Sequence, residues 1–331
     1  MGAGGDDDFA TSPVPDSGRG SVTTPFFAAL GMATALWTFA PPAREALADA
    51  VVPCTHEEAF GRLHAVRSTP EPWQFADASV RHMIAAGAIF ALGRAMYGAW
   101  PGFWAGFGWL MLPGVWFSSS LISTDALLLP LWSIALFAMW RLVNTRAWAW
   151  AAVLGLAIGV GVQAKYAMFY FFLCTALAAW WLEPVRAALA KGRGLLATLI
   201  ALIVIAPNLL WNIQNGFVTA RHTAANAHFD NTEMFNLDEL FEFIVGQAGV
   251  IGPVIFVVLI WALWRAWRRS DGLSTEEKFL IAYIIPPFVI ISAIAFISRA
   301  NANWAAVAYP ALLLLVTGTL FSSTDGRRTL V

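Results

Sequence analysis

Between Ala147 and Leu182 the sequence reads AWAWAAVLGLAIGVGVQAKYAMFYFFLCTALAAWWL, a run in which Lys165 is the single charged residue. As one helix at about 1.5 Å per residue this run would span roughly 54 Å, whereas the hydrocarbon core of a bilayer is about 30 Å thick. The run therefore predicts two membrane-spanning helices. We place the break near Gly159, Gly161 and Lys165, because glycine loosens a helix and an ammonium group seeks the interface or a polar cavity.

The rest of the chain repeats this apolar pattern. Of its 331 residues, 59% are apolar and 12% are charged, whereas soluble domains have about 45–50% and about 25%. A bilayer crossing needs about 20 residues, and apolar stretches that approach this length lie at 25–40, 83–98, 99–117, 126–142, 147–164, 166–182, 194–211, 241–264, 279–298 and 304–321. We therefore predict an all-α, polytopic transmembrane helix bundle of about ten crossings.

The chain divides into one long apolar domain between two short tails. Residues 1–24 are rich in Gly, Asp, Ser, Thr and Pro, which predicts a disordered tail. We expect the transmembrane domain at residues 25–322, with an atypical outer loop at 41–82, and a second tail at 323–331. The first apolar stretch could instead be the core of a signal peptide.

The positions of the basic residues predict the orientation in the membrane. They recur in alternate loops, at Arg141 and Arg146, at Arg186, Lys191 and Arg193, at Arg265, Arg268, Arg269 and Lys278, and at Arg327 and Arg328. Short loops rich in Lys and Arg favour the cytoplasm, so these loops and both tails are predicted to be cytoplasmic. The intervening connections, with Asp125, Lys165, residues 212–240 and residues 299–304, then share the opposite face.

Two charged residues interrupt apolar runs on that opposite face. Asp125 follows Ser123 and Thr124 and precedes an apolar run; it is either a helix-capping or first-turn acid or a general base for an acceptor hydroxyl. Lys165 either extends its ammonium to the lipid headgroups or binds a phosphate. An isolated charge inside a membrane costs roughly 2.5–3.5 kcal/mol on insertion scales, so a partner is expected.

Two polar clusters on the same face are further candidates. The loop after Pro207 includes Arg221 and His222, and a second loop runs from Arg299 to Trp304. We assign Arg221 and Arg299 to a donor phosphate, and we assign the following residues to the substrate: His222, Asn301, Asn303 and Trp304. An ordinary solvated loop and an interface anchor with Trp304 in the aromatic belt are the alternatives. The six-residue spacing of His222 and His228 specifies no metal.

Several classes of function are disfavoured by what the sequence does not contain. The basic residues form no stripe that could follow a nucleic acid backbone. No Gly-rich phosphate loop follows a predicted strand, which disfavours a nucleotide donor. Cys54 and Cys174 form neither a metal-ligand spacing nor a disulfide framework. A lipid-linked donor, by contrast, would reach a membrane site from the side.

Five short motifs carry a resemblance to a known family: Ser123–Ala126, Gln163–Tyr166, Pro207–Asn212, Arg221–His222 and Arg299–Trp304. Over roughly residues 83–321 the chain resembles the bacterial membrane glycosyltransferases of the C-type fold, family 39, which include protein mannosyltransferases and lipid A aminoarabinose transferases. The resemblance implies inverting transfer of a sugar from a polyprenyl-phosphate donor to a lipid, glycan or protein hydroxyl. It places the reaction at the outer face of the bacterial cytoplasmic membrane.

The resemblance also implies roles for single residues. It maps the family's acid at a helix mouth to Asp125 and its phosphate-stabilising lysine to Lys165, and it leaves a divalent metal open. The family's early Asp-Glu pair and its His-Pro-Pro turn do not stand here as expected. Glu57 is the nearest candidate for the catalytic acid, and a plain solvated acid is its alternative. A catalytically impaired relative and a polytopic transporter or flippase are therefore the competing readings.

Overall fold

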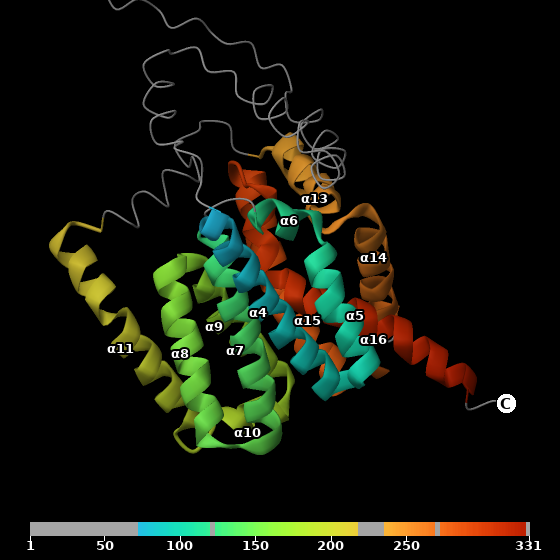
Figure 1. Ribbon diagram of the computed structural model, residues 1–331, viewed down its shortest axis with the longest axis horizontal. Helices are drawn as coiled ribbons and strands as arrows, with labels where there is room; N and C mark the ends of the chain where they lie inside the picture. The colour runs from blue at the N-terminus through green and yellow to red at the C-terminus, as the bar shows by residue number, and fades with distance from the viewer. Residues whose placement is uncertain (1–71, 120–122, 218–234, 269–271, 329–331) are drawn as a thin grey trace, which may run out of the picture.

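The computed structural model describes residues 72–119, 123–217, 235–268 and 272–328. Glu57, Arg221 and His222 lie outside the described residues. Within them the chain forms α-helices and short 3-10 helices and no strand (Figure 1). The prediction of an all-α helix bundle is confirmed.

The described helices fall into three groups along the chain. The first group is α4 (Pro72–Tyr97), α5 (Ala99–Met111) and α6 (Pro113–Ser119). The second group is α7 (Asp125–Thr145), α8 (Trp148–Ala164), η1 (Tyr166–Phe169), α9 (Tyr170–Trp181), α10 (Glu183–Leu189) and α11 (Arg193–Gln214). The third group is α13 (Leu237–Ile251), α14 (Pro253–Arg268), α15 (Thr275–Ile297), η3 (Ala302–Ala308) and α16 (Tyr309–Arg328).

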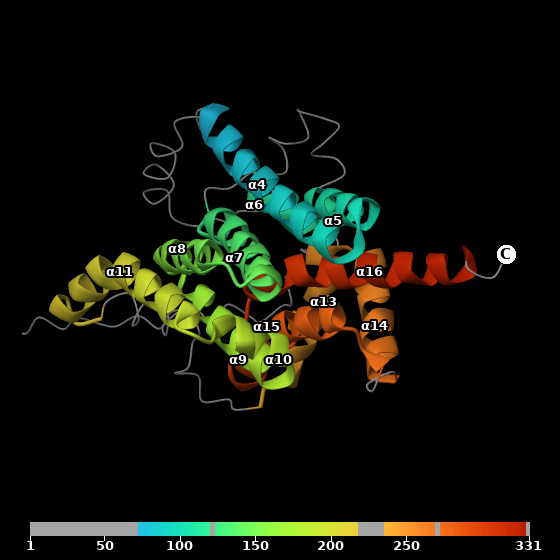
Figure 2. The ribbon, with the colours of Figure 1, turned by 90° about the horizontal axis from the view of Figure 1, so that it is seen from below.

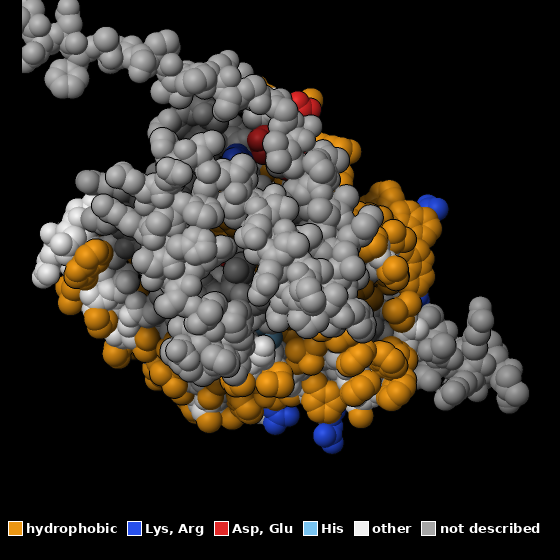
Figure 3. Space-filling view, turned by 45° about the horizontal axis from the view of Figure 1, so that its top comes forward, with side chains coloured by type: hydrophobic (Ala, Val, Ile, Leu, Met, Phe, Trp, Pro, Cys, Tyr) orange, Lys and Arg blue, Asp and Glu red, His pale blue; other side chains and the backbone are white. Residues whose placement is uncertain are grey.

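Several of these helices suit a membrane. Four are long and apolar enough to cross one, namely α7, α11, α15 and the Ala302–Phe321 segment, and the described residues hold up to six such spans if each bent pair counts as one. Apolar side chains dominate the described part of the face seen in Figure 3, and α11 and α16 lie on opposite sides of the bundle (Figure 2). The chain is a multi-pass membrane protein, while the predicted number of about ten crossings is not confirmed.

The stretch 241–264 differs from the single straight crossing that its length indicates. The chain bends by 113° between α13 and α14. Gly252 stands at the bend with a φ of +87°, a backbone conformation that glycine adopts at little cost. Pro253 then begins the next helix, where its missing N–H is not needed.

The break at Lys165 is confirmed, but the glycines before it have another role. Helix α8 runs through Ala164, and Lys165 has an extended backbone with φ −162° and ψ 136°. Gly159 lies inside the helix, where an added Cβ would come within 3.1 Å of the Ala201 backbone in α11. Small residues let helices approach closely in a membrane. The prediction that Gly159 and Gly161 contribute to the break is therefore wrong, because α8 continues through both.

Helices α4 and α5 form a hairpin whose backbones touch. An added Cβ at Gly102 would lie 2.6 Å from the Arg94 nitrogen, and one at Gly93 would lie 2.7 Å from the Gly102 Cα. Helix α4 begins at Pro72, inside the segment 41–82 that the sequence predicts to be a loop. Proline at a first helical position is favourable because its fixed φ already suits the helix.

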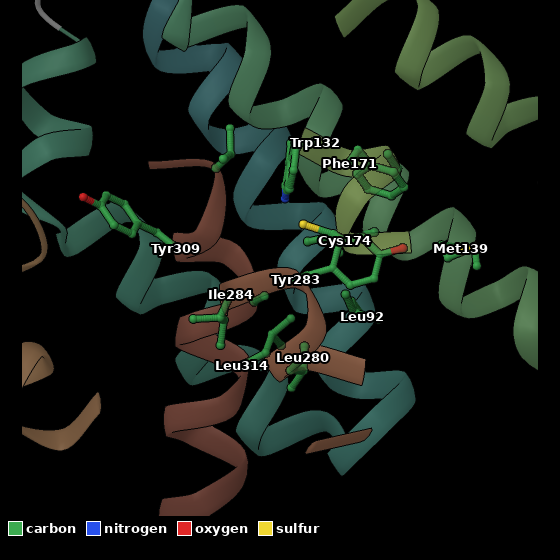
Figure 4. Close-up of a cluster of buried hydrophobic side chains, with 14 of the residues drawn as sticks. Leu92, Trp132, Met139, Phe171, Cys174, Leu280, Tyr283, Ile284, Tyr309 and Leu314 are labelled. Atoms are coloured by element: carbon green, nitrogen blue, oxygen red, sulfur yellow. The ribbon is translucent and has the colours of Figure 1, made fainter. Parts of the chain in front are cut away.

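The core lies where α4, α7, α9, α15 and α16 meet (Figure 4). Trp132 packs edge-on against Phe171 with a centroid distance of 5.1 Å, and Phe171 contacts Tyr283 at 4.9 Å. The Tyr283 hydroxyl is 2.8 Å from Thr175 Oγ1. This core fixes the positions of the helix ends that carry the polar residues.

Candidate functional site

An ion pair joins the two charged residues that the sequence singled out. Asp125 is the first residue of α7, and Lys165 stands between α8 and η1. Lys165 Nζ lies 2.7 Å from Asp125 Oδ1, and the two side chains are 29% and 13% exposed, respectively. The Lys165 ammonium therefore has a protein partner, so contact with lipid headgroups does not account for it alone.

Asn303 completes the contacts of the Asp125 carboxylate. Its Nδ2 donates a hydrogen bond of 2.8 Å to Asp125 Oδ2. Thr124 occupies the N-cap position of α7 and makes no side-chain capping bond, so Asp125 is a first-turn acid rather than the cap. Such an acid interacts favourably with the helix dipole. Both of its oxygens nevertheless point to groups from other elements, and we call Asp125, Lys165 and Asn303 the carboxylate triad.

The neighbours of Lys165 hold the helix break against α11. Gln163 Nε2 donates to the Val204 carbonyl at 2.8 Å, and the Tyr166 hydroxyl donates to Asn208 Oδ1 at 3.2 Å. Asn212 Nδ2 lies 3.3 Å from the same hydroxyl. Lys165 is thus held on both sides, by the residue two positions before it and by the residue after it.

The other described candidates do not join the hydrogen bonds of the carboxylate triad. Arg299 and Asn301 are exposed, and Arg299 lies within electrostatic range of Glu239 in the first turn of α13. Trp304 is half-buried and packs on a small apolar cluster that includes Phe243. Packing therefore accounts for Trp304, and its assignment to the substrate remains a prediction.

A buried histidine close to the triad escaped the sequence reasoning. His82 in α4 is 1% exposed, and neither ring nitrogen has a hydrogen-bond partner among the described residues. Its ring faces Trp109 at a centroid distance of 6.1 Å, and it lies within electrostatic range of Asp125. The available signal was an apolar helical pattern that starts before residue 83, which the predicted loop at 41–82 concealed.

A buried glutamine was missed as well. Gln247 in α13 is 2% exposed, and its amide donates to the carbonyl of Ala302, which precedes Asn303 in η3. The signal for it was a single uncharged polar residue within an apolar run. As for metals, the part of the chain that the structure describes contains no group of three or more His, Cys, Asp or Glu side chains that could hold one.

Comparison with known proteins adds to this geometry. Residues 78–211 match the family described as dolichyl-phosphate-mannose-protein mannosyltransferase. The predicted resemblance to this family is confirmed. The match includes Asp125 and Lys165 and ends before Asn303.

One curated relative and two solved structures are similar over most of the chain. Lipid A galacturonosyltransferase RgtD from Rhizobium johnstonii is 35% identical over 241 residues, which are 72% of this chain and 50% of RgtD. The crystal structure of ArnT from Cupriavidus metallidurans bound to undecaprenyl phosphate matches with a TM-score of 0.50 and 17% identity, over 77% of this chain and 47% of ArnT. Its apo state gives a TM-score of 0.48 and 19% identity, over 74% and 44%. The chain therefore spans about half the length of these relatives.

Proposed function

We propose that this protein is a membrane glycosyltransferase that moves a sugar from a polyprenyl-phosphate donor to a hydroxyl of lipid A. The observation that carries the proposal is the Asp125–Lys165 ion pair of 2.7 Å at one end of a membrane helix bundle. The name of RgtD supports the acceptor, and the undecaprenyl phosphate bound to ArnT supports the donor class. A one-sided site also suits a transferase better than a transporter with alternating access.

The extracytoplasmic face of the bacterial cytoplasmic membrane is the proposed location of the site. Asp125 begins α7, whereas Arg146 caps the other end of that helix and donates to the Pro184 carbonyl. Arg186 and Arg193 bond to backbone carbonyls near the same end. The positive-inside rule supports a cytoplasmic position for that end.

The reaction needs a cation for the leaving phosphate and a base for the acceptor. The bond between the sugar C1 and the phosphate oxygen breaks, a bond between C1 and the acceptor oxygen forms, and the acceptor proton passes to a carboxylate. A lysine ammonium has three donors, and Asp125 accepts one from Lys165. The remaining donors of Lys165 suit the departing phosphate, because a fixed cation stabilises charge that develops in the transition state.

The contact between the two residues supports a role for Asp125 on the phosphate side of this reaction. In an inverting displacement the acceptor attacks from the face opposite the leaving group. A carboxylate that touches the phosphate-binding ammonium therefore orients that ammonium, and another acid serves the acceptor. Glu57, outside the described residues, remains the candidate for the base.

Substitution of Lys165 tests the proposed function. The full chain in lipid vesicles, supplied with a labelled polyprenyl-phosphate sugar and lipid A, should form labelled lipid A. Lys165→Met should lower turnover about 100-fold or more, as loss of a transition-state donor does elsewhere. Lys278→Met is the matched control, because Lys278 is also half-buried and its ammonium lies over Trp181, the last residue of α9, whereas Lys165 stands beyond η1 at the opposite end of that helix. No transfer by the wild type, or equal activity of the two variants, would remove the proposal.

A further inference from the structure

Two buried polar side chains reach the first residue of η3, the short helix that carries Asn303. Gln247 in α13 and Tyr309 at the start of α16 are each 2% exposed. A buried amide or hydroxyl costs free energy unless it is hydrogen-bonded. Their partners therefore show what this pair of residues holds in place.

The two side chains form a relay that closes on η3. The Tyr309 hydroxyl donates to Gln247 Oε1 at 2.7 Å, and Gln247 Nε2 donates to the Ala302 carbonyl at 3.0 Å. The same amide group lies 3.2 Å from the Phe243 carbonyl in its own helix. Ala302 is the first residue of η3, and Tyr309 directly follows the last. The relay thus ties the two ends of this short helix together.

The position of the Ala302 carbonyl decides the direction of Asn303. The carbonyl of Ala302 and the amide nitrogen of Asn303 belong to one planar peptide unit. A hydrogen bond that holds the Ala302 oxygen therefore fixes the orientation of this peptide plane, and with it the direction in which the Asn303 side chain leaves the backbone. Asn303 is exposed and reaches Asp125 Oδ2 from there, and Tyr309 itself lies within electrostatic range of Asp125.

We propose that Gln247 and Tyr309 are positioning residues, which direct Asn303 to the Asp125 carboxylate and so hold the Asp125–Lys165 pair in place. The task of that pair in phosphate binding rests on the proposed function. The positioning itself rests on the hydrogen bonds alone. In Figure 4 the Tyr309 ring points away from Tyr283 and the side chains around it. The hydroxyls of the two buried tyrosines therefore have different partners.

The test compares two Tyr→Phe variants, alone and combined with Asn303→Ala. Tyr309→Phe removes the hydroxyl from Gln247, and Tyr283→Phe removes an equally buried hydroxyl from Thr175. Tyr309→Phe should lower kcat about tenfold, since even a displacement of about 1 Å can cost about 100-fold. It should lower kcat no further when Asn303→Ala is present, because the relay then has nothing to direct. Tyr283→Phe should leave kcat unchanged in both backgrounds.

A second readout does not depend on activity. The thermal unfolding midpoint of each single and double variant should show coupling between Tyr309 and Asn303 and additivity between Tyr283 and Asn303. Additive effects of Tyr309→Phe and Asn303→Ala on midpoint and kcat would overturn the inference. If the wild type transfers no sugar, the proposed function fails and the midpoints alone decide the positioning. Gln247→Met, which keeps the chain length and removes both hydrogen bonds to the relay, should reproduce Tyr309→Phe.

Discussion

Two short 3-10 helices, η1 and η3, each bring one residue to Asp125, and they are held in different ways. Each follows a residue with a non-helical backbone, Lys165 with φ −162° and ψ 136° and Asn301 with φ −76° and ψ 141°. Each is anchored by a tyrosine. Tyr166 is half-buried and bonds to Asn208, whereas Tyr309 is fully buried and bonds to Gln247.

The difference lies in what replaces each bond when it breaks. Polar groups near the surface can exchange a lost partner for water, whereas a buried donor or acceptor left unpaired bears the full desolvation cost. Tyr166 and Asn208 are half-buried, and the buried Asn212 that also reaches the Tyr166 hydroxyl keeps its hydrogen bonds to Asn208 when that hydroxyl is lost. The support of Lys165 is therefore softer than that of Asn303. Lys165, the proposed phosphate-binding cation, thus has the softer support. Asn303, whose amide orients Asp125, has the firmer support.

The largest expected effect comes from removing the negative charge of Asp125, which residues at both η1 and η3 contact. Asp125→Asn keeps the shape of the side chain and removes the negative charge beside Lys165. We expect turnover to fall about 100-fold or more, because the Lys165 ammonium loses the group that orients it. Turnover and binding of undecaprenyl phosphate would be measured together. Unchanged turnover would mean that the contacts of Lys165 and Asn303 with Asp125 contribute to the fold and not to the reaction.

A smaller effect separates the two anchors. Tyr166→Phe should lower the free energy of unfolding by about 1 kcal/mol or less, whereas Tyr309→Phe leaves a buried glutamine oxygen unpaired and should cost about 1–3 kcal/mol. Denaturant unfolding of both variants in the same detergent would give the two values. If Tyr166→Phe proves the more costly, the contrast between a soft and a firm support is wrong.

The smallest effect is expected at His82, a buried polar side chain that makes no hydrogen bond to η1 or η3. Replacing a polar side chain by an apolar one of similar shape is nearly neutral when no partner loses a bond. His82→Phe should therefore leave the unfolding free energy unchanged within about 0.5 kcal/mol, measured by the same unfolding experiment. A clearly larger loss would contradict this expectation and show that the packed surroundings of His82 do not accept the phenyl ring.

The sequence alone predicted the helix bundle, the break at Lys165 and the shared face of Asp125, Lys165 and Asn303. These features follow from charge: an ion inside an apolar run needs a partner, and basic loops fix the alternation of faces. Gln247 and Tyr309 could not be predicted in the same way. They carry no charge, and the bond between them joins residues 62 positions apart. Their roles depend on how α13 packs on η3 and α16, which no local pattern specifies.

The predictions for Gly159 and for the start of α4 were wrong for a geometric reason. A glycine inside an apolar run can mark a break, as Gly252 does, or a close helix contact, as Gly159 does. At Gly252 the following Pro253 is a local sign of the break, whereas the contact at Gly159 is decided by atoms of α11 that no local pattern specifies. The early start of α4 was missed similarly, since its first turns were assigned to a segment without a recognisable motif.

The backbone contact at Gly102 reverses the usual order of tolerance to substitution. In an ordinary core the largest side chains are the hardest to replace, but here the addition of one methyl group would bring its carbon to 2.6 Å from the Arg94 nitrogen. Large aromatic residues on the outward side of the same helix, such as Trp100 and Phe103, are exposed and have room to change. In this hairpin, therefore, the residue with no side chain is the one most tightly constrained by size.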